Sequence, residues 1–496
     1  MLPFDFLTHL PAVIPEAGLT VLALIVLLFD LRWHGERRHM IGLVAGLGMI
    51  LLAITPFVWA PTNPDVTYWG GMVRHDLLSQ VFKVIALLAG GITCLLTAET
   101  SELGRKGEFF LIIVVSTLGA CLMAAAADLI MVFVALETLS IPLYILASFS
   151  RKDKRSSEAG VKYFLFGSFA SAIMLYGFSL LYGLTGSTSL YEIAGFLGSP
   201  EFGVNVAPLL VTMVLIVVGF GFKISAVPFH FWTPDVYEGA PTPVTAFVSV
   251  ASKAASFALL MRFFVVVFPQ TLVVQGVEIQ HFWVNLLAVG AALSMTVGNV
   301  LALSQRNLKR LLAYSSIAQG GYTLIGVAAL QAGSAQSVAS VTFYMFMYLF
   351  TNMLAFGVII LFSEATGTDD VKDLAGLSRR NPWMALAMTI GFLSLAGIPP
   401  AAGFFGKFFL FNAAVEAGLT WLAILAVLNS IIGLFYYLVV IKVIYVDRSP
   451  DEDKAITVAP VAAWVLGVTS VVVVLLGTIG TQAVFNWALT SASSLL

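Results

Sequence analysis

Charge and cysteine are both scarce in this sequence. Only 10% of the 496 residues are charged, 59% are hydrophobic, and the mean hydropathy is +0.96. This composition excludes an ordinary soluble domain. The two cysteines, Cys94 and Cys121, lie in apolar segments and cannot supply the ligands of an iron–sulfur cluster, so we interpret them as small core residues. The net charge of −2 offers no basic face to a nucleic acid.

Nucleotide-binding motifs are also missing. No GxGxxG opens a helix after a strand, and Gly406 and Lys407 are followed by Phe408 where a P-loop needs Ser or Thr. We therefore expect this chain to bind no cofactor itself. No Lys or Arg precedes Arg32, so we expect the first apolar segment to remain as a helix, because a cleaved signal peptide begins with basic residues.

Long apolar segments are abundant. Windows of about 20 apolar residues, the length that crosses a bilayer as a helix, predict about fourteen spans, centred near residues 20, 49, 87, 116, 139, 171, 221, 254, 292, 319, 350, 398, 432 and 472. The sequence therefore predicts an all-α polytopic membrane protein.

The loops between the predicted spans alternate in charge. One set carries seventeen Lys and Arg residues, and the other set carries only Arg74. By the positive-inside rule, the basic loops lie in the cytoplasm. This assignment places both termini on the outer side of the membrane.

Seven basic side chains fall inside the predicted spans: Lys83, Lys162, Lys223, Lys253, Arg262, Lys407 and Lys442. A lysine at the centre of a membrane helix costs about 2.5 to 3.5 kcal/mol on insertion scales, so such residues usually face a wet cavity. Lys223, Lys253 and Lys407 lie near the middle of their segments, and Glu137 lies in equally apolar surroundings. We interpret these four residues as a proton path.

The other four basic residues are closer to the ends of their segments. Lys83, Arg262 and Lys442 are expected to extend along their helices to the membrane surface. Lys162 follows Glu158 by one helical turn, and for it the same interpretation and a functional one are equally open.

Prolines interrupt two segments that carry a deep lysine. Pro228 deprives the carbonyl of Ile224 of its helical donor, and Pro399 and Pro400 do the same for Leu395 and Ala396. Irregular backbone is tolerated in a bilayer only where it is buried in protein or lines a cavity. We therefore predict two broken helices, each next to a lysine.

The two interrupted segments share a short string. GFGFK ends at Lys223 and GFFGK ends at Lys407, which is 407 − 223 = 184 residues later. An odd number of helices separates them, so we predict two inverted five-helix repeats, helices 4–8 and 9–13. The predicted division is 1–107 for the first three helices, 108–270 and 271–447 for the repeats, and 448–496 for the last helix.

His230 follows the first break. It is interpreted either as a structural histidine that donates to a freed carbonyl or as a proton relay, since its unperturbed pKa of about 6.5 suits exchange near neutral pH. Asp235 and Glu238 are expected in a solvated cytoplasmic turn. Asp128 begins the fifth predicted helix and is expected to cap it or to lie at the outer membrane interface.

Four longer strings carry a resemblance: ALETLSIPLYIL, YEGAPTPVTAFVSVASKAASFA, NLKRLLAYSSIAQGGY and SLAGIPPAAGFFGKF. They resemble the antiporter-like subunits of respiratory complex I, the proton-pumping NADH:quinone oxidoreductase, over nearly the whole chain. The family has three branches, named after subunits L, M and N of the bacterial complex. Lys407 stands where the pattern of the M branch has glutamate, and the sequence shows no long lateral extension of the kind typical of the L branch. The resemblance is therefore to the N branch of bacterial complex I.

The resemblance implies roles for particular residues. Glu137, Lys223, Lys253 and Lys407 match the proton path of the family, and Lys162 and His230 match its relay positions. It implies that Glu137 and Lys223 form a switchable ion pair, in which the proton affinity of the lysine depends on whether the carboxylate is near.

The resemblance also implies a setting. The partners would be other complex I subunits, especially antiporter-like subunit M and the small membrane subunits J and K, together with membrane lipids. FMN, iron–sulfur clusters and quinone would be bound by partner subunits, in a bacterial plasma membrane. Two alternatives stay open: a subunit of a multi-subunit sodium/proton antiporter, and a membrane scaffold that does not pump.

Overall fold

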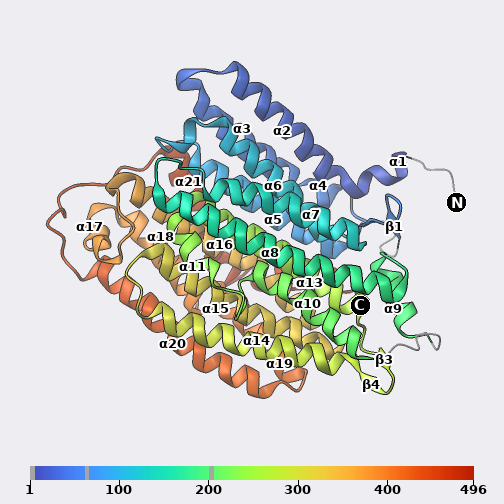
Figure 1. The fold of residues 1–496 in the computed structure, drawn as a ribbon. Coiled ribbons are helices and arrows are strands. Elements are labelled where there is room, and N and C mark those ends of the chain that lie inside the picture. Colours follow the sequence, from blue (N-terminus) through green and yellow to red (C-terminus); the bar gives the residue numbers. More distant parts are fainter. Residues whose placement is uncertain (1–5, 62–65, 200–205, 496) are drawn as a thin grey trace.

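The computed structural model describes residues 6–61, 66–199 and 206–495, and most of them form long helices (Figure 1). The first half contains α2 (Ile14–Arg32), α3 (His39–Leu52), α5 (Leu77–Thr97), α6 (Gly107–Ala125), α7 (Leu129–Ala147), α8 (Lys154–Thr185), α10 (Val206–Ile224), α11 (Trp232–Gly239), α12 (Thr242–Phe247) and α13 (Lys253–Val267). A π-helical turn, Val248–Ser252, joins α12 to α13.

The second half contains α14 (Ile279–Ala302), α15 (Leu308–Ala328), α16 (Ala335–Thr366), α18 (Pro382–Ala396), α19 (Gly403–Glu416), α20 (Thr420–Tyr445), α21 (Pro460–Leu476) and α22 (Thr481–Ala492). Short helices lie in the connections: α1 (Phe6–His9), α4 (Thr55–Val58), α9 (Leu190–Leu197) and α17 (Leu377–Arg380). Two antiparallel hairpins complete the described fold, β1 (Thr67–Tyr68) with β2 (Val73–Arg74) and β3 (Val273–Val274) with β4 (Val277–Glu278).

Eleven of the described helices are long and apolar enough to cross a membrane, and α21 with α22, bent by 81°, makes a possible twelfth. The two remaining predicted spans were centred near residues 319 and 398. The first centre falls on α15, which carries several polar residues, and the second falls on the break between α18 and α19. The membrane class and the helical fold are confirmed. The count of fourteen and the inverted repeat stay predictions.

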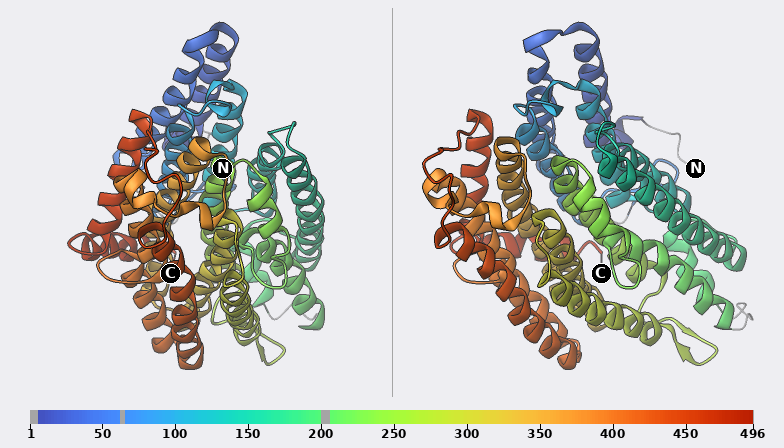
Figure 2. Two further views of the ribbon diagram at one scale, coloured as in Figure 1. Left: turned by 90° about the vertical axis from the view of Figure 1, so that its left-hand side faces the viewer. Right: turned by 60° about the vertical axis from the view of Figure 1, so that its left-hand side comes forward.

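The helices form a bundle with two distinct ends. The short helix α17 lies at one end in Figure 1, and α9 and the hairpin β3–β4 lie at the other. Figure 2 shows α2 and α3 as a pair at the edge of the bundle, where α2 packs on α6 and α3 packs on α5. The centre is α5, α12–α13 and α16, whose apolar windows are 94%, 89% and 89% buried.

Short polar side chains fix where several helices begin. Asp128 accepts a hydrogen bond from the N–H of Ile130, as its expected capping role requires. Asn307 caps α15 and Asn381 caps α18 in the same way. Asp76 and Ser79 form a reciprocal capping box at the start of α5.

Both predicted breaks are present. α10 ends at Ile224 and α11 begins only at Trp232, while α18 ends at Ala396 and α19 begins at Gly403. The second break is tightly packed, because a Cβ atom on Gly403 would lie 1.7 Å from the carbonyl oxygen of Ser394. Only glycine fits at this position.

Candidate functional site

The lysine at the first break contacts a serine on a neighbouring helix. Lys223, next to the end of α10, donates to Oγ of Ser140 on α7 at 2.5 Å. Glu137 lies one helical turn before Ser140 and interacts electrostatically with Lys223. Its buried Oε1 has no hydrogen-bond partner among the described residues. The lysine and the glutamate are thus neighbours without a closed ion pair, and their switchable pairing stays a prediction.

Lys253 opens α13 directly after the π-helical turn. Its ammonium group donates to the carbonyl oxygen of Ser316 at 2.5 Å and to Oγ of the same residue at 2.6 Å. Two tyrosine hydroxyls also reach this Oγ, that of Tyr348 at 3.1 Å and that of Tyr237 at 3.3 Å. Lys253 therefore lies at the edge of a cluster of hydroxyl groups.

The polar face of α15 continues from this cluster toward the second break. One turn beyond Ser315, Gln319 donates through Nε2 to the carbonyl oxygen of Leu395 at 3.0 Å and to the hydroxyl of Tyr437 at 3.3 Å. Oγ of Ser315 is 2.5 Å from the same hydroxyl. The hydroxyl of Tyr344 donates to Oε1 of Gln319. The carbonyl that Pro399 was predicted to free is thus bonded to this polar face.

Lys407 uses the other freed carbonyl. Its ammonium donates to the carbonyl oxygen of Ala396 at 3.1 Å and lies 4.7 Å from the centre of the Tyr322 ring. Gly397, with φ of +83°, brings the backbone close, because a Cβ atom there would lie 3.0 Å from Cδ of Lys407. The break therefore supplies the polar surroundings that this lysine needs.

The three deep lysines share one property. Lys223, Lys253 and Lys407 are 3%, 2% and 6% exposed. Within the described ranges, none of them has a carboxylate within the 4.0 Å of an ion pair. Their polar contacts are hydroxyl groups, backbone carbonyls and aromatic rings.

His230 is buried in the first break, and its Nδ1 has no hydrogen-bond partner in the part of the chain that the structure describes. No hydrogen bond links it to the deep lysines there. The geometry leaves both interpretations of His230 open.

Lys162 belongs to a separate ionic cluster. It pairs with Glu158 and with Asp235, both at 2.7 Å, and Arg310 pairs with Asp235 and with Glu238, both at 2.9 Å. Asp235 and Glu238 were expected in a solvated turn. The turn is wrong, because both residues lie in helix α11, but their side chains keep 36% and 29% exposure while they pair with residues of α8 and α15. These residues line a cavity of about 220 Å³.

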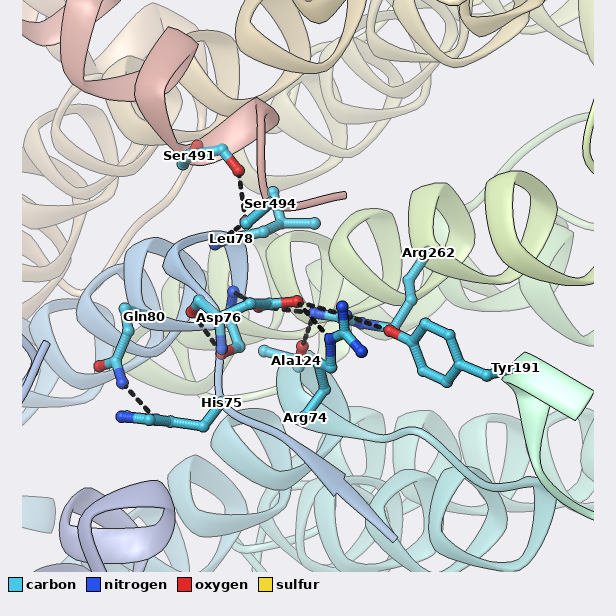
Figure 3. A network of polar contacts seen from close by, with 11 residues as sticks. Arg74, His75, Asp76, Leu78, Gln80, Ala124, Tyr191, Arg262, Ser491 and Ser494 are labelled. Carbon is cyan, nitrogen blue, oxygen red and sulfur yellow. Dashed lines mark hydrogen bonds and ion pairs between the residues drawn. The ribbon is translucent and has the colours of Figure 1, made fainter. Parts of the chain in front are cut away.

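Two basic residues that were expected to reach the membrane surface are fully buried instead. Lys83 pairs with Glu16 at 2.8 Å and donates to the carbonyl oxygen of Ala12 at 2.9 Å. Arg262 binds both carboxylate oxygens of Asp76, at 2.6 and 2.9 Å, and its third strong partner is the hydroxyl of Tyr191 at 3.0 Å. Figure 3 shows Arg262 facing Asp76 and Tyr191. Lys442, by contrast, is exposed and pairs with Asp447, as expected.

The buried cations change the acid–base behaviour of their neighbours at the start of α5. Burial opposes ionisation of Asp76, but the charge and hydrogen bonds of Arg262 outweigh it and hold the pKa of Asp76 below its usual value. Burial, reinforced by the charge of Lys83, lowers the pKa of His75 to about 4. His75 is therefore neutral at pH 7, and its Nδ1 lies 2.8 Å from Nε2 of Gln80 (Figure 3).

Sequence reasoning missed Ser140 and Ser316, the hydroxyl partners of Lys223 and Lys253. It also missed the polar side chains that are hydrogen-bonded to Ser316 or lie along α15: Ser315, Gln319, Tyr237, Tyr344, Tyr348 and Tyr437. One signal was available, since YSSIAQ places two serines and a glutamine at helical spacing in an apolar segment. No group of three or more His, Cys, Asp or Glu residues that could hold a metal ion occurs among the described residues.

Comparison with known proteins places these features in a context. A family model described as "NADH:quinone oxidoreductase/Mrp antiporter, TM" matches residues 126–433. NADH-quinone oxidoreductase subunit N of Trichlorobacter lovleyi is 44% identical over 463 residues, which cover 92% of this chain and 91% of the relative. The chloroplastic NAD(P)H-quinone oxidoreductase subunit 2 of Mesostigma viride is 43% identical over 452 residues, with coverages of 90% and 87%.

A solved structure is similar over the same extent. A chain of respiratory complex I from Thermus thermophilus, solved with bound aureothin, superposes with a TM-score of 0.77 and 32% sequence identity, covering 95% of this chain and 98% of that one. Sequence and fold therefore agree on one group of membrane proteins.

Proposed function

This chain belongs to the NADH:quinone oxidoreductase/Mrp antiporter family of membrane subunits, and we propose that it moves protons along the buried residues of its central axis. The observation that carries the proposal is the set of three deep lysines with neutral partners. A protonated lysine without a carboxylate partner in an apolar interior is poorly stabilised, so it can give up its proton when its surroundings change.

The geometry suggests an order of stations. Glu137, Ser140 and Lys223 form the first, and Lys253 with Ser316 forms the second. The polar face of α15 then leads to the second break, where Lys407 is the third station. Lys162 and His230 are proposed as relays at the side of this axis, and hydroxyl groups, which both donate and accept, are suited to carry protons between stations.

The proposed energy source lies outside this chain. Moving one charge against 100 mV requires about 2.3 kcal/mol, which a change of one to two pKa units, at about 1.4 kcal/mol each, can supply. In the proposed setting, electron transfer from NADH to quinone in partner subunits, through FMN and iron–sulfur clusters, drives the change. Subunits M, J and K are the proposed neighbours in the membrane.

The proposed orientation places the basic loops in the cytoplasm and both termini on the outer side of a bacterial plasma membrane. Protons would then enter from the side that carries α11 and α17 and leave on the side of the two hairpins. The ionic cluster of Lys162, Asp235, Glu238 and Arg310 lies toward the side of entry.

The test uses the intact complex in vesicles and the variant Lys223→Met. We expect the complex to assemble, because removal of a buried charge also removes its desolvation cost and Glu137 can take up a proton. The number of protons moved per electron pair should fall. An unchanged number would exclude Lys223 from the path, and purification without flavin and iron–sulfur partners would favour the antiporter alternative.

A further inference from the structure

An apolar groove runs between α18 and α21 on the side of the molecule that carries the basic loops. Its volume is about 650 Å³, within the range of ligand pockets, and its lining includes Met384, Ala387, Ile390, Ala463, Gly467 and Ser470. Small residues on α21 create the space, since no atom lies within 4 Å of the place where Gly467 would carry a Cβ.

Two tryptophans mark the level of the groove in the membrane. Trp383 begins α18 and is 80% exposed, and Trp464 lies in the first turns of α21 and is 75% exposed. Tryptophan is enriched where the hydrocarbon of a bilayer meets the headgroups. The mouth of the groove is therefore at headgroup level.

A second cavity, of about 430 Å³, adjoins the mouth and shares Val458 with the groove. Its lining contains four charged residues, Glu99, Glu364, Arg380 and Lys454. Lys454 pairs with Asp451 at 2.7 Å. Within the described ranges, the other three have no oppositely charged side chain within 4.0 Å. A cavity at headgroup level thus holds one cation and two anions that have no ion-pair partner within this distance.

Backbone contacts hold these three side chains in place. Nε of Arg380 donates to the carbonyl oxygen of Lys454 at 3.1 Å. Oε2 of Glu99 accepts from the N–H of Val461 at 2.9 Å, and Oε1 of Glu364 accepts from the N–H of Ser101 at 2.8 Å. Each charged group keeps further donor or acceptor atoms for a ligand.

We propose that the groove and the adjoining cavity bind one molecule of phosphatidylethanolamine. An acyl chain fills the groove, the phosphate binds the guanidinium group of Arg380, and the ammonium group lies between Glu99 and Glu364. Arginine matches phosphate geometry with paired N–H donors. A primary ammonium has three N–H donors for the two carboxylates.

The same charges disfavour other lipids. Phosphatidylglycerol has no ammonium group to balance its phosphate, so the two carboxylates repel its net negative charge. The choline group of phosphatidylcholine is a cation but has no N–H to donate. The lipid would also contact α18 from Met384 to Ile390, and Ile390 lies six residues, about 9 Å along the helix, from Ala396, which holds Lys407. The inference concerns lipid binding and does not depend on proton transport.

The experiment uses the intact complex in vesicles of equal parts phosphatidylethanolamine, phosphatidylcholine and phosphatidylglycerol. In three parallel preparations, one of the lipids carries a photoreactive group on its acyl chain, and labelled residues are mapped by mass spectrometry. We expect phosphatidylethanolamine to label α18 and α21 several-fold more than either other lipid. Equal labelling by the three lipids, a preference for phosphatidylglycerol, or no labelling of the groove would each overturn the proposal.

Variants with matched controls locate the site. Gly467→Leu should abolish the excess labelling by filling the groove, whereas Gly183→Leu, at a glycine of α8 that also has open space, should not. Arg380→Gln should reduce the preference several-fold, whereas Arg379→Gln, whose arginine pairs with Glu452, should leave it unchanged. Glu99→Gln with Glu364→Gln should remove the discrimination against phosphatidylglycerol. Equal effects of variant and control would also overturn the proposal, and co-purification of the partner subunits checks that each variant is assembled.

Discussion

The molecule buries two kinds of basic side chain, and they differ in their partners. Lys83 and Arg262 are 0% exposed and each binds a carboxylate, that of Glu16 or that of Asp76. Lys223, Lys253 and Lys407 are nearly as buried but contact only neutral groups among the described residues. Depth alone therefore does not separate a structural cation from a functional one.

The partner decides what each cation can do. A buried carboxylate stabilises the charged form of its partner, so the first kind is a fixed charge that ties helices together. Hydroxyl and carbonyl oxygens stabilise the charge less, so the second kind can change its protonation state with a small change in surroundings. The comparison leads to four predictions. Loss of a carboxylate-paired cation such as Arg262 should affect assembly, whereas loss of a deep lysine such as Lys407 should affect transport.

The largest expected effect is on stability, from Arg262→Met. This variant leaves the buried Asp76 carboxylate with only a long contact to Nε of Arg74, at 3.9 Å. Removing the main partner of a buried ion pair costs about 3–5 kcal/mol. We expect loss of the assembled subunit, measured as its recovery with the purified complex and by its thermal unfolding.

A matched double variant separates charge from packing. Arg262→Met with Asp76→Ser removes both charges and keeps a side-chain acceptor for the start of α5. We expect this variant to recover much of the stability. If the double variant is as unstable as Arg262→Met alone, the ion pair is not the reason for the loss.

The second prediction concerns Lys407, where the effect should be on transport. Lys407→Arg keeps the positive charge but should strongly reduce proton translocation, because arginine is not deprotonated in proteins. Lys407→Ala should reduce it as well, and both variants should assemble. Proton movement per electron pair in vesicles is the measurement, and parent-like pumping by Lys407→Arg would exclude deprotonation at this site.

The third prediction is smaller and concerns the neutral partners. Ser316→Ala removes the hydroxyl group that contacts Lys253, Tyr237 and Tyr348 but keeps the carbonyl that holds the lysine. We expect a stability loss of about 1–3 kcal/mol, because three hydrogen bonds are lost at about 0.5–1.5 kcal/mol each, and a partial loss of transport. Ser304→Ala, at an exposed serine, is the control. A variant that pumps like the parent would show that Lys253 does not need this hydroxyl.

Local chemistry explains which features the sequence could predict. A proline removes a specific N–H donor, so the free carbonyls of Leu395 and Ala396 could be predicted from neighbours within five residues. Both carbonyls indeed accept hydrogen bonds from other helices, one from Gln319 and one from Lys407. The depth of Lys223, Lys253 and Lys407 was equally readable, because it depends only on position within an apolar segment.

Long-range contacts explain what the sequence could not show. Ser140 is 83 residues from Lys223, and Ser316 is 63 residues from Lys253. The prediction that Lys83 and Arg262 extend to the membrane surface was wrong for the same reason. It considered each helix alone, whereas α2 brings Glu16 to Lys83 and the start of α5 brings Asp76 to Arg262.

The smallest effect is expected for Lys442, which completes the comparison as an exposed cation. Its side chain is 60% exposed, and the Asp447 carboxylate with which it pairs at 2.8 Å is also partly in contact with solvent. Surface ion pairs contribute about 0–1 kcal/mol, and less at high salt. Lys442→Ala should therefore change stability by about 0.5 kcal/mol or less and leave proton movement per electron pair unchanged, measured beside Lys407→Ala in the same vesicles. A loss of pumping as large as that of Lys407→Ala would mean that a carboxylate partner and solvent exposure do not exclude a lysine from the transport path, and the distinction between the two kinds of cation would fail.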